Sequence, residues 1–281
     1  AEFKKGIAGR FAPGLPDKRD GQLLFMLNGL AKLKDDGQMT IIQNGSPLYI
    51  GDAGTGSSEI RRYLIENDWL DAIVQLPGNA FYNTPIATYI WIVMKNKPVV
   101  HQGKVQLLDA SACASSRRKN IGDKKVDITK ACRDLIIEAY GAYVDGTYNG
   151  VDENDNVIIV KSKVMDAIDL GYNKIVVETP KLDEDGNVVM KKKKPVADTS
   201  KRDTENVPLA EDIDAYFERE VIPYNPQAWI DKAKTKVGYE IPFTRTFYEY
   251  KQIEPSDVIA ARIEEHEKSL MAKLHDLFGG E

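Results

Sequence analysis

The stretch Leu76-Pro-Gly-Asn-Ala-Phe-Tyr-Asn-Thr-Pro-Ile-Ala-Thr-Tyr-Ile-Trp91 decides how this chain folds, because it places a turn-rich loop between two apolar runs. Residues 70–76 and residues 87–94 are short, apolar and rich in β-branched or aromatic side chains, which predicts two buried strands. Only about ten residues join them, and parallel strands need a longer crossover, so an antiparallel pair is expected. The aromatic pair Phe81-Tyr82 on the joining loop suits a protein that grips a flat ring.

The elements before this stretch indicate the fold class. Leucines at helical spacing predict a helix over residues 21–34, and residues 39–43 read as a short buried strand. A polar, glycine-rich loop at residues 44–56 precedes a second helix, which Ser57 or Ser58 can cap. Helix, strand, loop, helix, strand, loop and strand is the order expected for the second half of a doubly wound α/β sheet.

Beyond this half-sheet the pattern becomes less regular. Residues 105–108 predict one more strand, residues 117–125 a basic loop, and residues 128–140 a helix. Residues 171–180 predict a strand that leads into an Asp-Gly turn, and residues 188–190 are expected to return as its partner. The hairpin formed by residues 171–180 and 188–190 is expected to be appended to the core sheet.

Residues 76–89 resemble a motif of the M (modification) subunit of type I restriction-modification systems, an adenine-specific DNA methyltransferase. The family pattern is Leu-Pro-x-x-x-Phe-Tyr-Asn-Thr-Gly-Ile-Ala-Thr-Tyr, and only Pro85 departs from it, where the family usually has Gly. Further similar segments follow the same order along nearly the whole chain: 44–48, 51–56, 60–63, 104–111, 203–209 and 238–245. Several matches in one order are far more specific than any single match.

The resemblance implies a fold, a division of the chain and an activity. Residues 1–112 would form the C-terminal half of a Rossmann-like methyltransferase core that uses S-adenosylmethionine. Residues 113–210 would form an appended strand and hairpin region, and residues 211–281 a C-terminal helical region for subunit contact. The complete subunit would transfer a methyl group from S-adenosylmethionine to adenine N6 in double-stranded DNA.

The family's catalytic tetrapeptide, Asn-Pro-Pro-Phe or Asn-Pro-Pro-Tyr, is absent from this sequence. The nearest approaches, at residues 44–47, 83–85 and 225–227, lack either the second proline or the aromatic residue. The usual cofactor strand and glycine turn are missing as well, so S-adenosylmethionine is expected to be bound mainly by an upstream part. The chain therefore resembles the C-terminal part of the subunit and is expected to be inactive alone. The alternative is a non-catalytic M-like scaffold that binds the specificity subunit.

The loop at residues 51–56, Gly-Asp-Ala-Gly-Thr-Gly, is a second candidate for a cofactor turn. A ribose-binding acid should then end the next strand, whereas Asp71 stands at the start of one. This mismatch favours a different role, as a mobile loop near the DNA or the rim of the active site.

The aromatic pair on the joining loop is the candidate pocket for the target base. An enzyme cannot reach a base amino group inside the duplex, so an aromatic side chain would stack on the flipped adenine. The alternative is that both rings fill the core. The position on a loop between strands and the family motif favour stacking for Phe81, with Tyr82 second, while Asn83 is equally suited to bracing the turn.

Basic side chains at two places are candidates for DNA contact: Arg61 with Arg62, and Arg117 with Arg118. For the first pair the favoured alternative is a solvated helix face, with acidic residues at helical spacing. The lysine run at residues 191–194 could also touch phosphate, although its sequence favours one arm of an exposed hairpin.

Charge argues against a broad DNA-binding surface, because the net charge is -5 and the pI is near 5.5. The resemblance implies that a separate specificity subunit reads the DNA target and that a restriction subunit joins the full complex. A helix that begins at residues 255–257 has a narrow apolar seam, which is the candidate surface for the specificity subunit or alternatively folds back on its own domain. The seam consists of Val258, Ile259, Ile263, Leu270, Leu274 and Leu277.

Composition excludes other classes. The chain lacks a run of about eighteen apolar residues and a signal-peptide pattern, so neither a membrane span nor export is expected and the cytoplasm is predicted. Cys113 and Cys132 have no metal-ligand spacing, and only 3 His residues are present, so no metal site is expected. Two idle thiols in a reducing compartment are predicted instead.

Overall fold

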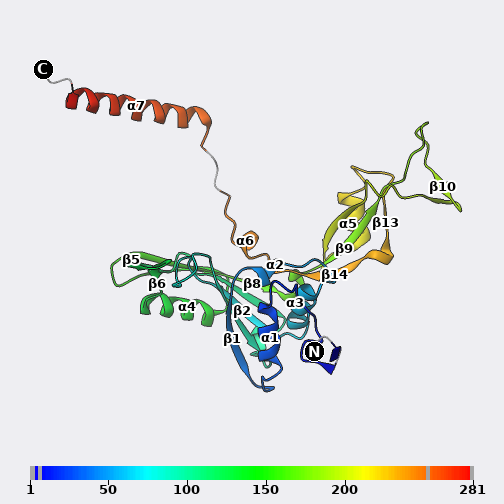
Figure 1. The fold of residues 1–281 in the computed structure, drawn as a ribbon, viewed down its shortest axis with the longest axis horizontal. Coiled ribbons are helices and arrows are strands. Elements are labelled where there is room, and N and C mark those ends of the chain that lie inside the picture. Colours follow the sequence, from blue (N-terminus) through cyan, green and yellow to red (C-terminus); the bar gives the residue numbers. More distant parts are fainter. Residues whose placement is uncertain (1–3, 6–7, 251–253, 279–281) are drawn as a thin grey trace. The chain divides into compact units, whose positions relative to one another are not determined.

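The computed structural model gives the positions of residues 4–5, 8–250 and 254–278, and the chain is α/β in class (Figure 1). It divides into two units, residues 1–246 and residues 247–281, which are described separately. The first unit contains a six-stranded sheet and a smaller appended sheet. The second contains one long helix.

The central sheet has the strand order β1-β3-β2-β4-β8-β7. The pair β2–β4 is parallel, and every other neighbouring pair in this sheet is antiparallel. The strands are β1 (Gln38–Gln43), β2 (Leu70–Gln75), β3 (Tyr89–Met94), β4 (Lys104–Asp109), β7 (Gly146–Val151) and β8 (Val157–Asp166).

The predicted antiparallel pair is confirmed as β2 and β3, with Ile73 opposite Trp91. Since β3 is also antiparallel to β1, the strands β1, β2 and β4 all run in one direction. Their carboxyl ends therefore lie at one edge of the sheet. This edge is where the family-like loops after residues 43 and 75 begin.

Burial explains the strand order. Both faces of β2 are buried, because Ala72 and Val74 join a core cluster with Cys132 and Leu135 of α4, while Ile73 is buried on the other face. Strand β1 alternates between exposed and covered residues and pairs only with β3. The strand at residues 39–43, which was predicted to be short and buried, is therefore a half-buried edge strand.

Helices flank the sheet with bounds that differ from the expected ones. The first helix ends at Leu30 and not near residue 34, and Thr55 is the N-cap of the second helix. The predicted caps Ser57 and Ser58 are buried within that helix, where the Ser58 hydroxyl accepts a hydrogen bond from the Tyr239 N–H at 3.0 Å. The helices of this unit are α1 (Gln22–Leu30), α2 (Ser46–Tyr49), α3 (Gly56–Glu66), α4 (Lys130–Ala142), α5 (Ile213–Glu220) and α6 (Phe243–Thr246), with 3-10 turns at Val99–His101, Ala167–Leu170 and Lys232–Lys234.

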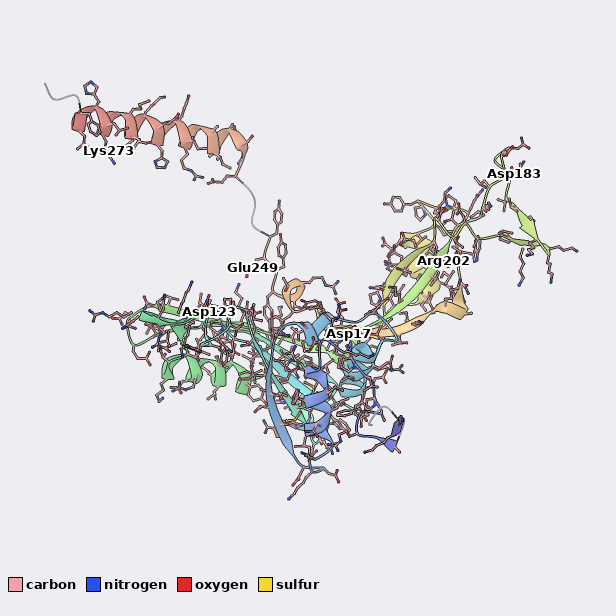
Figure 2. All side chains as sticks on the ribbon, viewed as in Figure 1. Asp17, Asp123, Asp183, Arg202, Glu249 and Lys273 are labelled. Atoms are coloured by element: carbon pink, nitrogen blue, oxygen red, sulfur yellow. The ribbon has the colours of Figure 1, made fainter. Side chains whose placement is uncertain are left out.

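The appended sheet is built around β9 (Gly171–Glu178), which pairs with β12 (Asp203–Pro208), β13 (Trp229–Ile230) and β14 (Lys236–Tyr239). The prediction that residues 188–190 pair with this strand is wrong. Val207 of β12 fills that place because it is buried against Val177 and Phe217 of α5. Residues 179–198 instead form a separate arm with its own pair, β10 (Met190–Lys191) and β11 (Lys194–Pro195), and Asp183 marks its acidic turn (Figure 2).

The predicted basic loop at residues 117–125 is a β-hairpin, made of β5 (Ser115–Ile121) and β6 (Lys124–Asp127). Its turn contains Gly122 with a φ of 58°, a left-handed conformation that glycine adopts without steric cost. The expectation failed because a run of charged residues has no hydrophobic alternation that would reveal a strand.

The side chain of Arg61 joins the core to the appended sheet. It is fully buried at 0% exposure, and it donates to the carbonyl oxygens of Pro47, Ile50 and Gly51 at 2.9 to 3.1 Å and of Tyr239 at 2.5 Å. Burial lowers the pKa of Arg61 to about 10, so the group stays charged at neutral pH. A side chain in this position has no surface for a phosphate, which corrects its assignment as a DNA contact.

Its neighbour Arg62 follows the alternative prediction. It is partly exposed and pairs with Glu66 at 2.9 Å and with Glu59 at 3.8 Å along the helix surface. Such exposed pairs add little to stability.

We predict that Arg61→Met lowers the free energy of unfolding by at least about 3 kcal/mol, because several buried carbonyls lose a charged donor. Urea unfolding of the chain measures this loss. The matched control Arg62→Met should change the value by no more than about 0.5 kcal/mol. Equal losses in the two variants would contradict the role given to Arg61.

Candidate nucleic-acid interface

The carboxyl edge of β1, β2 and β4 gathers the segments that the sequence singled out. The loop at residues 44–56 follows β1, the loop at residues 76–88 follows β2, and the segment that leads into the β5–β6 hairpin follows β4. In open α/β sheets, ligands bind beyond the carboxyl ends of the strands. This edge is therefore the candidate site.

The loop at residues 76–88, named here the aromatic loop, is closed by its own backbone. The Leu76 N–H donates to the Thr88 carbonyl at 2.8 Å, and the Asn79 N–H donates to the Pro85 carbonyl at 3.1 Å. Phe81 is partly buried and packs against the core cluster beneath α4. Tyr82 is 66% exposed. The loop therefore holds one ring against the core and presents a second ring to solvent.

The β5–β6 hairpin is attached directly to the aromatic loop. The Asp123 N–H donates to the Tyr82 carbonyl, the Lys125 N–H donates to the Asn79 carbonyl, and the Asn79 side-chain amide donates to the Asp123 carbonyl, each at 2.9 Å. A Cβ at Gly122 would lie 2.6 Å from the Tyr82 carbonyl oxygen, so the contact requires glycine there. The label of Asp123 in Figure 2 marks this hairpin. The structure thus joins two segments that the sequence presented separately.

The amino-acid sequence does not single out Asn79 as a functional residue. Its φ is 56°, a left-handed value that asparagine tolerates better than most residues. The only available signal was its place after Gly78 in a turn-rich stretch, which does not reveal a partner 44 residues away.

The basic residues of the hairpin fall into two groups. Arg117 forms a salt bridge with Asp127, and Lys124 pairs with the same carboxylate at 2.9 Å. Hydrogen bonds from Lys124 and Arg117 lower the pKa of Asp127. Arg117 therefore helps to hold the hairpin together, and its role as a DNA contact stays a prediction, whereas Arg118 is exposed and has no side-chain partner within the described residues.

The base of the hairpin is fixed by a buried carboxylate. Asp152 accepts from the Ser115 hydroxyl at 2.5 Å and from the backbone N–H groups of Asn154 and Asn156 at 2.8 and 2.9 Å. These hydrogen bonds, led by the one from Ser115, hold the pKa of Asp152 well below its usual range.

The remaining member of the predicted base pocket, Asn83, is exposed, and its side chain makes no hydrogen bond within the part of the chain that the structure describes. It does not brace the turn in this structure.

The glycine loop at residues 51–56 is tied down on both sides. Asp52 pairs with Lys174 of β9 at 2.6 Å, the Gly51 carbonyl binds Arg61, and a Cβ at Gly54 would meet the Lys236 side chain at 3.2 Å. A Cβ at Gly56 would lie 1.9 Å from the Leu15 carbonyl oxygen, so the start of α3 is covered. These residues do not fit a cofactor cradle. The loop is a joint between the two sheets, and its expected place at the rim of the active site stays a prediction.

The two cysteines are free and buried. Burial raises the pKa of the Cys113 thiol to about 12, so this thiol is inert at neutral pH, as predicted. Among residues 4–5, 8–250 and 254–278, no group of three or more His, Cys, Asp or Glu side chains is placed to hold a metal ion. No helix within those ranges is long and apolar enough to cross a membrane.

The predicted helix at the end of the chain is confirmed as α7 (Ser256–Phe278), and none of its residues is buried within its own unit. At about 100° per residue, the seam positions other than Val258 fall within about 60° of one another. These are Ile259, Ile263, Leu270, Leu274 and Leu277.

Comparisons with known proteins support the resemblance. The family model for N-6 DNA methylases matches residues 3–176, so the chain belongs to this family. It is 29% identical to the methylase subunit of type I restriction enzyme MjaIX from Methanocaldococcus jannaschii over 109 residues, which is 38% of this chain and 19% of that protein. It is 28% identical to the HindI methylase subunit from Haemophilus influenzae, over 42% of this chain and 26% of that protein.

Among solved structures, the type I methyltransferase subunit from Streptococcus thermophilus matches with a TM-score of 0.46 and 26% identity, over 57% of this chain and 30% of that one. The chain thus corresponds to less than a third of the length of these relatives. The family assignment made from the sequence is confirmed, as is the α/β fold class.

We predict that Asp152→Asn destabilises the protein most at neutral pH. A lowered native pKa means that the ionised Asp152 stabilises the fold above the unfolded pKa, near 4. The contribution is lost as the pH falls through the native value. The stability difference between the wild type and the variant, measured by urea unfolding from pH 7 to pH 3, should narrow below about pH 4. A difference that widens toward acid would contradict this assignment.

Proposed function

We propose that this chain is part of the M subunit of a type I restriction-modification system and supplies the surface that receives the target adenine. The complete subunit transfers a methyl group from S-adenosylmethionine to adenine N6 in double-stranded DNA. One observation supports this most: an aromatic loop of the family motif lies at the carboxyl edge of the sheet, with a basic hairpin fixed to it. Family membership supports the methyl-transfer class.

In this proposal the chain binds and orients the base. An adenine that leaves the duplex stacks on Phe81, whose ring is held in place by the core, while Tyr82 closes over it from the exposed side of the loop. A ring that is already fixed loses little conformational entropy on binding.

The methyl donor is held by residues outside this chain. The glycine loop does not fit a cofactor, and the Asn-Pro-Pro-aromatic acceptors are absent from the sequence. The chain alone is therefore inactive in this proposal.

Partner proteins supply the DNA target recognition. The net charge of -5 suits a subunit that makes few phosphate contacts and leaves the target sequence to a specificity subunit. Helix α7, which has an apolar seam and no buried residue within its own unit, is the proposed docking helix for that subunit. A restriction subunit completes the complex, which acts in the cytoplasm.

A second candidate is a non-catalytic scaffold that binds the specificity subunit through α7. The exposed seam favours this role because it needs a partner whether or not methyl transfer occurs. The two candidates differ in what they predict for the aromatic loop: substitutions there slow methyl transfer if the chain receives the target base, and have no such effect if the chain is a scaffold.

We predict that Phe81→Leu slows methyl transfer by the complete subunit, assembled with its specificity partner, roughly 5- to 150-fold, because base stacking contributes about 1 to 3 kcal/mol. Leucine keeps apolar bulk against the core and removes the flat ring. Tyr82→Leu should have the same direction of effect. The control Ile86→Ala, at an exposed aliphatic residue of the same loop, should leave the rate unchanged. Unchanged rates in both aromatic variants would favour the scaffold.

We predict that the double substitution Ile263→Glu with Leu270→Glu abolishes copurification of the complete subunit with the specificity subunit, because two charges would enter the apolar contact. The matched control adds the same charges on the opposite face of α7, as Ala261→Glu with Ala272→Glu. Size-exclusion chromatography of the mixed subunits measures assembly. Loss of assembly only in the control would place the docking face elsewhere.

A further inference from the structure

We propose that the β5–β6 hairpin binds DNA phosphates beside the target adenine, and that Asn79 transmits the position of the hairpin to the aromatic loop. This inference rests on the proposed function and adds a second ligand site and a positioning residue to it. The ligand is the sugar-phosphate backbone next to the base that leaves the duplex.

The charge of the hairpin differs from that of the chain. Residues 115–127 contain five basic and two acidic side chains, although the whole chain has a net charge of -5. Asp127 pairs with both Arg117 and Lys124, which leaves one positive charge of this cluster uncompensated, and the remaining acid, Asp123, lies at the turn.

Three basic side chains remain available for a ligand. Arg118, Lys119 and Lys125 are exposed, and none has a side-chain partner within the described residues. Exposed basic groups that lack internal partners can release counterions when they meet phosphates, which is the main source of DNA affinity. Arg118 and Lys119 lie on β5 and Lys125 lies on β6, so the three charges belong to both strands of the hairpin.

The hairpin also has a fixed relation to the aromatic loop. Its turn is bonded to the carbonyl of Tyr82, and its second strand is bonded to the carbonyl of Asn79 through the N–H groups of Lys125 at 2.9 Å and Val126 at 3.4 Å. Its first strand is anchored at the base by Ser115 and Asp152. A hairpin held at both ends transmits position instead of swinging freely.

Asn79 makes the contacts that fix the hairpin relative to the aromatic loop. Its side chain and its backbone carbonyl each bind the hairpin, while its backbone N–H closes the aromatic loop. It touches neither the base nor the phosphates in this proposal, so it acts as a positioning residue.

The lysine run at residues 191–194 provides a matched control. It is also exposed and also lies in a hairpin, but this hairpin belongs to the arm at residues 179–198, with no hydrogen bond to the aromatic loop within the described residues. Removing three of its charges changes the net charge by the same amount as removing the three free charges of the β5–β6 hairpin, and it leaves the proposed phosphate site intact.

The first test is the salt dependence of DNA binding by the complete subunit in complex with its specificity partner. Arg118→Gln, Lys119→Gln and Lys125→Gln together should reduce the slope of log K against log salt by about 2 to 3, since each phosphate contact contributes about 0.9. Lys191→Gln, Lys192→Gln and Lys193→Gln together should leave the slope unchanged. An unchanged slope in the first variant would overturn the phosphate site, whereas failure of the wild-type complex to bind DNA would count against the proposed function itself.

The second test separates positioning from folding. Asn79→Asp removes the amide donor to Asp123 and places a carboxylate against a carbonyl. Fluorescence from a purine analogue at the target position should show roughly 2- to 13-fold less flipped base, as expected for one lost hydrogen bond, with the wild-type salt slope retained and the variant still folded at the assay temperature. Asn79→Gly, which adopts the same backbone conformation without strain, should give a smaller loss. Wild-type flipping by Asn79→Asp would refute the role of Asn79.

Discussion

The fold depends on the guanidinium of Arg61. Its hydrogen bonds to four carbonyls join α3 to the loop after β1 and to the last strand of the appended sheet. A buried charged group is stable only when its N–H donors have hydrogen-bond acceptors. The chain segments that supply these carbonyl oxygens must therefore keep their positions. This constraint turns the glycine loop from a flexible connection into a joint. It also fixes where the appended sheet meets the edge that bears the candidate site.

The direction of the strands then determines which segments can act together. Because β3 is antiparallel to both of its neighbours, β1, β2 and β4 end at one edge, and the loops that follow them become neighbours. The aromatic loop and the basic hairpin meet there through backbone hydrogen bonds, which do not depend on side-chain identity except at Asn79 and Gly122. An acidic chain can in this way contain a local basic surface at one edge of its sheet.

Much of this arrangement was predictable from the sequence. The apolar runs around the aromatic loop predicted β2 and β3 and their antiparallel pairing, and helical periodicity predicted α4 and α7. The burial of Arg61 was not predictable, since arginine on a helix is almost always exposed and nothing in its spacing distinguishes it from Arg62. The partner of β9 was misassigned because local turn chemistry favoured the nearest strand, while burial of Val207 decided the pairing. The contact between Asn79 and the hairpin is nonlocal and has no periodic signal.

The most direct test of the central claim is photochemical cross-linking of the complete subunit, bound with its specificity partner to a duplex that has a photoreactive base at the target adenine. Mass spectrometry of the digested complex would identify the attached peptide. Attachment is expected within residues 76–88, at Phe81 or Tyr82. Attachment confined to α7, to the arm at residues 179–198 or to the partner protein would contradict the claim that this chain receives the target base.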